Sequence, residues 1–237
     1  MMIAAPIFAS RSFPVRAKAA VVVVLSYVAL PVVGGSVTVP TDLGGVAFAL
    51  LVGKEVLIGL AFGLTAQMLF AAVQVAGGLI DINAGFAIAS VLDPSSNINI
   101  TVLGRYYNLV ATSAFLAIGG HRWLVAGIVE SFNLAPVTEM PSTDAIVSGV
   151  LGRADDIFLV ALMIGAPILV TLFVSDIALG ILARAVPQMN VFIVGLPLKI
   201  VLALAGTAVL IPTTMGFFGD LTNRMLGDLS HMLGGGG

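Results

Sequence analysis

The chain contains no cysteine, few charged residues and only two histidines. Without cysteine it has no disulfide framework, no thiolate nucleophile and no cysteine-ligated metal. The histidines, His121 and His231, stand far apart and outside any metal-ligand spacing. Lysine and arginine together number 10 in 237 residues and are scattered, so the dense basic surface typical of nucleic-acid binding is missing.

Motifs of catalysis are missing too. The sequence has no GxSxG elbow, no HExxH zinc motif and no phosphate-binding loop followed by lysine and serine or threonine. Ser131 has Glu130 beside it and His121 ten residues earlier, which is better explained by chance than by a catalytic triad. We therefore expect no enzymatic activity, no cofactor and no metal site.

What the chain has in abundance is apolar residues. Hydrophobic residues make up 59% of the sequence and charged residues 9%, against about 25% charged residues in soluble domains. The mean hydropathy of +1.14 could not be spread over a water-facing surface without large exposed apolar patches. Inside a bilayer an open strand leaves backbone groups unpaired, so helices are favoured. The composition predicts an all-α polytopic membrane protein.

The stretch 54–93 is the longest apolar region, interrupted by a few polar positions. Residues 56–80 form 25 positions without a formal charge, and about 20 suffice for a helix to cross a bilayer. Glycines within it allow helices to approach closely. It also contains polar side chains, which a helix facing lipid would not need: Thr65, Gln67 and Gln74. These features predict a helical hairpin packed against other helices, with its turn at 81–83 or at 93–94.

The remaining apolar runs predict further helices separated by breaks. The runs are 19–33, 100–118, 157–175 and 200–219. A glycine pair at 119–120 breaks one run, and residues 187–190 join the last two into a second hairpin. The segment 221–233 is polar enough to lie at an interface. The polar segment 134–156 is the expected connection between an N-terminal region, 1–133, and a C-terminal region, 157–237.

The N-terminal region carries the basic cluster of the chain, formed by Arg11, Arg16 and Lys18. Basic residues beside an apolar run favour a cytoplasmic loop; the alternative is a solvated loop without topological meaning. The apolar residues 1–10 precede these charges, which is the wrong order for a secretory signal. We expect that the N-terminus is truncated or starts late.

Ionisable residues within the apolar regions are candidates for function, because such residues are costly in a membrane. They are Asp81, Asp176, Arg184 and Lys199. They could line the path of a small-solute secondary transporter or channel. The alternative, which the chemistry favours, is structural: each pairs with a neighbouring subunit or sits at the water line.

A second candidate is the piece in which bulky apolar residues run into the glycine pair. Glycine frees the backbone to leave the helix, and apolar residues at a constriction can exclude water and ions. The alternative is an ordinary turn between helices, and chemistry alone favours it. The candidate residues are Phe115, Leu116, Ile118, Gly119, Gly120 and His121.

Several segments, in order along nearly the whole chain, carry a resemblance to a known family. The segments are 5–8, 11–16, 55–63, 71–77, 93–95, 120–124 and 184–198. Among them, Gly120-His121-Arg122-Trp123-Leu124 and Ala185-Val186-Pro187-Gln188-Met189-Asn190 are good examples. Together they resemble the FliR family of flagellar biosynthetic proteins and its SctT-like counterparts in virulence-associated type III secretion, with the flagellar branch closer.

The resemblance implies a fold of helical hairpins packed in a helical export-gate assembly. It implies a subunit that works with FliP-like and FliQ-like subunits and contacts an FlhB-like subunit. This gate passes unfolded flagellar proteins across the bacterial inner membrane at the flagellar basal body. The implied partners are therefore these subunits, the unfolded export substrates and membrane lipid, and no nucleic acid. The family's N-terminal part resembles the P subunit and its C-terminal part the Q subunit, which fits a boundary at 134–156.

The resemblance also bears on both sets of candidate residues. In the family a loop of this subunit plugs the pore of the closed gate, and it matches residues 115–121 here. The resemblance therefore favours a pore plug over an ordinary turn between helices at these residues. Lys54 and Glu55 join the four ionisable residues above as candidates for pairing between subunits.

Overall fold

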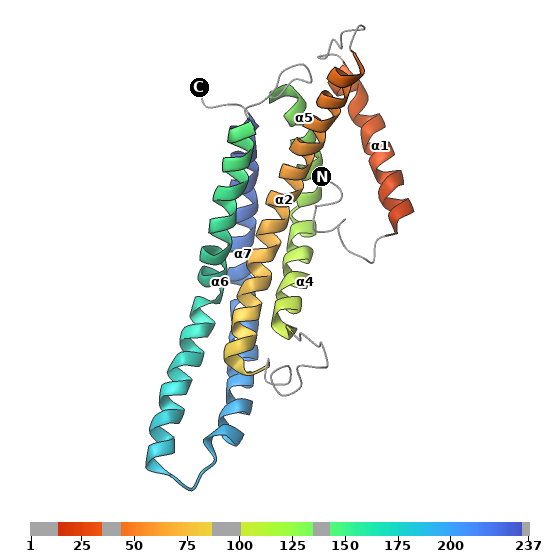
Figure 1. Ribbon diagram of the computed structural model, residues 1–237. Helices are drawn as coiled ribbons and strands as arrows, with labels where there is room; N and C mark the ends of the chain where they lie inside the picture. The colour runs from red at the N-terminus through yellow and green to blue at the C-terminus, as the bar shows by residue number, and fades with distance from the viewer. Residues whose placement is uncertain (1–13, 35–43, 87–100, 135–142, 234–237) are drawn as a thin grey trace. The chain divides into compact units, whose positions relative to one another are not determined.

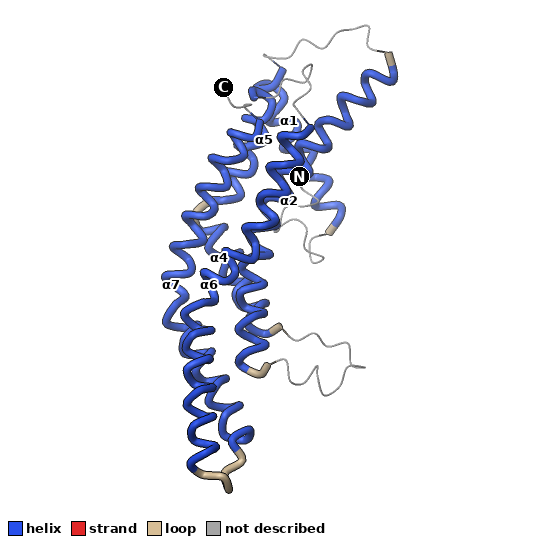
Figure 2. Tube along the Cα trace, turned by 60° about the vertical axis from the view of Figure 1, so that its left-hand side comes forward, coloured by secondary structure: helices blue, strands red, loops and turns tan. Residues whose placement is uncertain are grey.

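The computed structural model describes residues 14–34, 44–86, 101–134 and 143–233. Every regular element in these ranges is a helix (Figures 1 and 2), which confirms the prediction of an all-α protein. The helices are α1 (Val15–Gly34), α2 (Gly45–Ala84), α4 (Val102–Ala117), α5 (Gly120–Leu134), α6 (Thr143–Ala185) and α7 (Val191–Leu233).

The chain divides into two compact units that interleave along the sequence. The first consists of Met1–Phe70, Ala114–Asp156 and Gly219–Gly237, and the second of Ala71–Ser113 and Ile157–Phe218. Because the long helices run through the division points, α2, α4, α6 and α7 each contribute to both units.

In the first unit α1 contacts α5, and α5 packs on the first part of α2. A Cβ placed on Gly127 of α5 would lie 3.0 Å from the ring of Phe62 of α2, so the glycine admits the ring. Phe70 of α2 meets Phe115 edge-to-face, with ring centroids 5.5 Å apart. These contacts make α2 the helix on which α5 and the end of α4 are placed.

In the second unit the α6–α7 hairpin packs with the last part of α2 and the first part of α4. The buried residues of α6 recur every three or four positions, which places them along one helix face. They are Val160, Ala161, Ile164, Ile168, Leu172, Ser175 and Leu179. Small residues of α7 lie against this face: a Cβ on Gly206 would come within 3.3 Å of Ile168, and one on Gly195 within 2.9 Å of Leu179.

The loop of the α6–α7 hairpin lies at residues 186–190, where the sequence predicted it. Asn190 caps α7, because its side-chain oxygen accepts a hydrogen bond of 3.1 Å from the amide of Phe192. The predicted break at the glycine pair is confirmed as well, since α4 ends at Ala117 and α5 begins at Gly120, with a bend of 70° between them.

The outer faces of the long helices remain apolar. Three helical segments, 45–84, 150–185 and 191–221, are long and apolar enough to cross a membrane, and a fourth would come from α4 and α5 counted as one broken span. In the apolar 18-residue stretch by which α7 could span a membrane, only 17% is buried within the chain. The exposed apolar side chains of α6 and α7 include Phe158, Val170, Phe173, Phe192, Val201 and Val209. Lipid or other subunits must cover these faces.

The structure differs from two of the expected connections. A turn at 81–83 is wrong, because α2 continues as a helix through Ala84; the alternative turn at 93–94 lies outside the described residues. α6 begins at Thr143, inside the segment 134–156 expected as a connection. The division into N-terminal and C-terminal regions at that segment stays a prediction.

Candidate functional site

Most of the predicted candidates lie at two places, one in each unit, while Lys54, Glu55 and Arg184 lie elsewhere. The first is the helix break at 115–121, in the first unit. The second is the last turn of α2 with the two residues after it, 81–86, which we call the α2 terminal turn, in the second unit.

The helix break depends on the backbone of Gly119. Its φ of +75° lies in the left-handed region, which glycine enters without steric cost. The amide of Gly119 donates to the carbonyl of Leu116 over 3.1 Å, which closes α4. The carbonyl of Gly119 then accepts a 2.8 Å hydrogen bond from the amide of Arg122, in the first turn of α5. One residue thus ends one helix and starts the next.

Phe115 and Gly120 are buried beneath this break. Phe115 is 1% exposed and lies in its edge-to-face contact with Phe70. A Cβ on Gly120 would lie 2.7 Å from Cζ of Phe115, so only glycine lets the ring lie against this backbone. For these two residues the geometry is that of a packed interhelical turn.

Leu116 and Ile118 have the opposite environment, since each is 46% exposed at the outside of the break. His121 is partly buried, and its Nδ1 has no hydrogen-bond partner among the described residues. The sequence grouped six residues as a plug. The structure divides them into a buried support and a small exposed apolar surface, and a gating role for that surface stays a prediction.

At the α2 terminal turn, Asp81 joins α2 to α4. Its side chain is buried, and its two oxygens accept hydrogen bonds from the amides of Leu103 over 3.0 Å and Gly104 over 3.2 Å. These amides belong to the first turn of α4, whose N–H groups lack partners within the helix. A carboxylate there also interacts favourably with the helix dipole. Asp81 is thus the N-terminal cap of α4, supplied by another helix.

The two helices approach closely beside this cap. A Cβ placed on Gly77 would lie 2.6 Å from both Cα and N of Gly104. The obstacle is backbone, which cannot rotate away as a side chain can. Gly77 therefore permits the approach that brings Asp81 to the start of α4.

The end of α2 is closed by hydrogen bonds that follow the Schellman pattern. Gly85 adopts a left-handed φ of +91°. The amide of Phe86 donates to the carbonyl of Asp81 over 3.0 Å, and the amide of Gly85 to that of Ile82 over 3.3 Å. These bonds satisfy two of the last carbonyls of α2 and leave that of Asn83 available.

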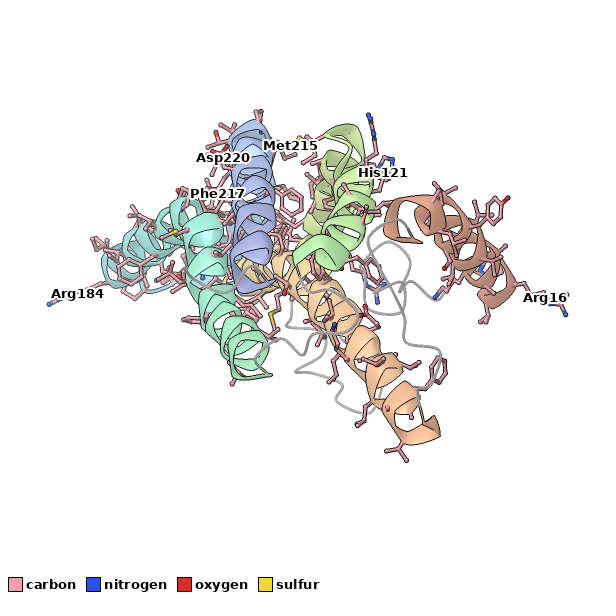
Figure 3. The ribbon with its side chains drawn as sticks, turned by 90° about the horizontal axis from the view of Figure 1, so that it is seen from above. Arg16, His121, Arg184, Met215, Phe217 and Asp220 are labelled. Atoms are coloured by element: carbon pink, nitrogen blue, oxygen red, sulfur yellow. The ribbon has the colours of Figure 1, made fainter. Side chains whose placement is uncertain are left out.

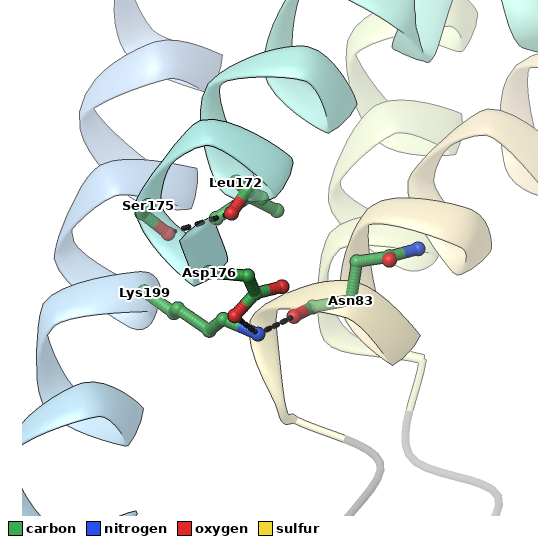
Figure 4. Close-up of polar contacts among 5 residues, drawn as sticks. All are labelled: Asn83, Leu172, Ser175, Asp176 and Lys199. Carbon is green, nitrogen blue, oxygen red and sulfur yellow. Dashed lines mark hydrogen bonds and ion pairs between the residues drawn. The ribbon is translucent and has the colours of Figure 1, made fainter. Parts of the chain in front are cut away.

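Lys199 of α7 takes up that carbonyl. Its Nζ donates to the oxygen of Asn83 over 3.3 Å and forms an ion pair with Asp176 of α6 (Figure 4). One ammonium group therefore ties the end of α2 to both arms of the α6–α7 hairpin.

The other predicted charged residues, Lys54, Glu55 and Arg184, lie in different surroundings. Lys54 is buried and forms an ion pair of 3.5 Å with its neighbour Glu55. Arg184 is exposed and projects away from α6 (Figure 3), and it makes no ion pair within the described part of the chain. Among the described residues, every charged candidate except Arg184 has a partner within the chain, while pairing between subunits stays a prediction.

Sequence reasoning missed the Asp81 cap and the Lys199 tie. Asp81 and Leu103 are 22 positions apart, and Asn83 and Lys199 are 116 apart. The one local signal was Gly85, a glycine that follows an apolar run and is typical of a helix end. No group of three side chains suited to metal binding occurs in the ranges that the structure describes.

The long apolar helices, their uncovered faces and the helix break define a class: a polytopic helical membrane protein that packs closely through glycines. Comparison with known sequences gives the family. The profile of "Bacterial export proteins, family 1" matches residues 1–225. The chain therefore belongs to this family of bacterial export proteins, which includes the FliR and SpaR proteins.

Its relatives agree with this assignment. The flagellar biosynthetic protein FliR of Escherichia coli is 32% identical over 230 residues, which are 97% of this chain and 87% of the relative. FliR of Bacillus subtilis is 40% identical over 156 residues, 65% of this chain and 60% of the relative. The surface presentation of antigens protein SpaR of Shigella sonnei is 30% identical over 166 residues, 69% of this chain and 64% of the relative.

Proposed function

We propose that this chain is a subunit of a flagellar type III secretion export gate. With FliP-like and FliQ-like subunits, and in contact with an FlhB-like subunit, it forms the channel that passes unfolded flagellar proteins across the inner membrane. It works at the flagellar basal body. The observation that carries this proposal is the match to the FliR protein of Escherichia coli over 97% of the chain.

The surface of the chain supports assembly with other helical subunits. Within the described residues, much of the apolar surface of α6 and α7 is left uncovered. Stripes of this kind are buried either by lipid or by helices of partners. A gate built from several helical subunits would cover them.

The relatives favour the flagellar branch over the virulence branch. The FliR proteins of Escherichia coli and Bacillus subtilis are 32% and 40% identical to the chain over 230 and 156 residues, whereas SpaR of Shigella sonnei is 30% identical over 166 residues. We therefore propose flagellar proteins as the exported substrates.

Co-purification tests the proposed assembly. The tagged chain, expressed together with the FliP-like, FliQ-like and FlhB-like proteins of the same bacterium, should bring them along in stable proportions after extraction in mild detergent. A tagged unrelated polytopic protein serves as control. Recovery of the chain alone, together with uptake of a small solute by vesicles that contain only this chain, would support a transporter instead.

We propose further that Leu116 and Ile118 form the apolar surface that seals the closed gate. Both are exposed at the outside of the helix break, and apolar side chains at a constriction exclude water and ions. Phe115 and Gly120 would act indirectly, because their contact holds the break in shape.

The seal is best tested at Ile118, because substitutions of the glycines would change the backbone or displace Phe115. In vesicles that contain the whole assembly, Ile118→Asn should raise ion conductance in the absence of substrate. Leu109→Asn is the matched control, since Leu109 is an exposed apolar residue too but lies within α4, away from the break. Equal conductance of an intact assembly with either substitution would refute the seal.

A further inference from the structure

The α2 terminal turn carries two polar ties that differ in how deeply they are buried within the chain. The Asp81 cap of α4 is buried, because Asp81 is 1% exposed. In the second tie, the side chain of Lys199 is 20% exposed and that of Asp176 46%. A buried charge that loses its partners is left unsolvated, so the first tie is hard to break. Ion pairs that water reaches contribute little net stability, because water solvates both charges when they separate, so the second tie is the easier of the two to open wherever it meets water.

Beyond Lys199 the loop of the α6–α7 hairpin lies past the end of α2 (Figure 1). From Asp176 to the end of α6 the hairpin extends for about 14 Å, at about 1.5 Å per residue. Contact between its own arms, such as Leu179 against Gly195, holds this part together. The hairpin tip, which we define as residues 177–198, can therefore move as one body.

Two packing contacts also hold the hairpin on the last part of α2. The side chain of Leu196 lies against Gly85 at the end of α2. Nearer the middle of α2, Gly165 of α6 lies close to the backbone of Ala76: a Cβ on Gly165 would be 3.8 Å from the carbonyl oxygen of Ala76. The hairpin is thus packed on the last part of α2 through Gly165, and the start of its tip is held there by Leu196 and by the ammonium group of Lys199.

We propose that Lys199 is a releasable latch that sets the position of the hairpin tip. While its Nζ binds Asp176 and the carbonyl of Asn83, the tip is held to the end of α2. When these contacts open, the tip tilts about the packed region near Gly165, and α4 stays in place because the Asp81 cap is intact. Gly165 lies about 30 Å from the end of α6, so a tilt of about 10° moves the end of the tip by about 5 Å. The latch is a property of the second unit and does not depend on the proposed export gate.

Spin-label distances in the full chain, reconstituted in lipid nanodiscs, test the latch. The chain has no native cysteine, so pairs of introduced cysteines label specifically. Val75→Cys with Phe192→Cys reports the tip against α2, and Val75→Cys with Leu109→Cys reports α4 against α2; these three residues are exposed. Lys199→Met should broaden and shift the first distance distribution and leave the second unchanged.

Two variants serve as controls. Arg184→Met removes an exposed cation of the same hairpin that makes no ion pair among the described residues, and it should leave both distributions unchanged. Lys199→Arg keeps the charge and the donors and should restore most of the native tip distribution. The latch is overturned if Lys199→Met leaves the tip distribution unchanged. It is also overturned if both distributions broaden together, since Lys199 would then support the whole unit rather than the tip.

Discussion

Replacing Gly77 with alanine is the sharpest test of how α2 and α4 pack. The added Cβ would lie 2.6 Å from Cα and N of Gly104 and 2.8 Å from the carbonyl carbon of Leu103. All three are backbone atoms, so the contact is relieved only if one helix moves. Such a movement pulls the first amides of α4 away from Asp81, whose hydrogen bonds are already 3.0 and 3.2 Å long.

The adjacent Gly78 supplies the matched control. A Cβ on Gly78 would meet nothing within 4 Å. Both substitutions gain the same helix propensity, about 1 kcal/mol for alanine over glycine, and this gain cancels in their difference. What remains is the overpacking, about 1–3 kcal/mol, and the weakened cap, about 0.5–2 kcal/mol. We expect Gly77→Ala to be less stable than Gly78→Ala by roughly 1.5–5 kcal/mol.

The assay is unfolding of the purified chain in mild detergent, followed by far-ultraviolet circular dichroism during titration with a denaturing detergent. Hydrogen exchange at the amides of Leu103 and Gly104 gives the local readout, and it should become faster in Gly77→Ala alone. Equal unfolding midpoints for the two variants would refute the close approach of α2 and α4. Unequal midpoints with unchanged exchange would refute the loss of the cap.

Two further predictions concern single residues. Asp81→Ala leaves the first amides of α4 without an acceptor in a buried place, so exchange at Leu103 should become faster and stability should fall by about 1–3 kcal/mol. Gly119→Asn should preserve the helix break, because asparagine tolerates left-handed φ, whereas Gly119→Val should destabilise the chain by about 1–2 kcal/mol; thermal unfolding of the two variants side by side measures the difference.

Where local signals decide the structure, the sequence was sufficient. The glycine pair at 119–120 predicts the end of α4, because glycine alone enters the left-handed region without cost. Pro187 and Asn190 predict the loop of the α6–α7 hairpin, since proline cannot continue a helix and asparagine caps the next one. Each of these signals lies within a few residues of the feature that it specifies.

Where a local structure depends on a residue far away in the sequence, the local pattern gave a wrong prediction. The segment 81–83 contains Asp81 and Asn83, which are typical of turns, and we therefore expected a turn there, inside what is α2. The helix continues there because the carboxylate of Asp81 finds two amides at the start of α4. A buried charge is tolerated once it is hydrogen-bonded, and no local pattern reveals that the acceptor and donors will meet.

The amino-acid sequence by itself determined the class of this protein: an apolar, cysteine-free chain with 9% charged residues must form helices with uncovered apolar faces. Its ordered motifs determined the family. Only the tertiary structure decided where the candidate residues lie and what they contact. Phe115 became a buried support while Ile118 stayed exposed, and Lys199 met the carbonyl of Asn83, 116 positions away. The reason is physical: burial and polar pairing depend on how distant helices pack, and that packing is not encoded in the spacing of neighbouring residues.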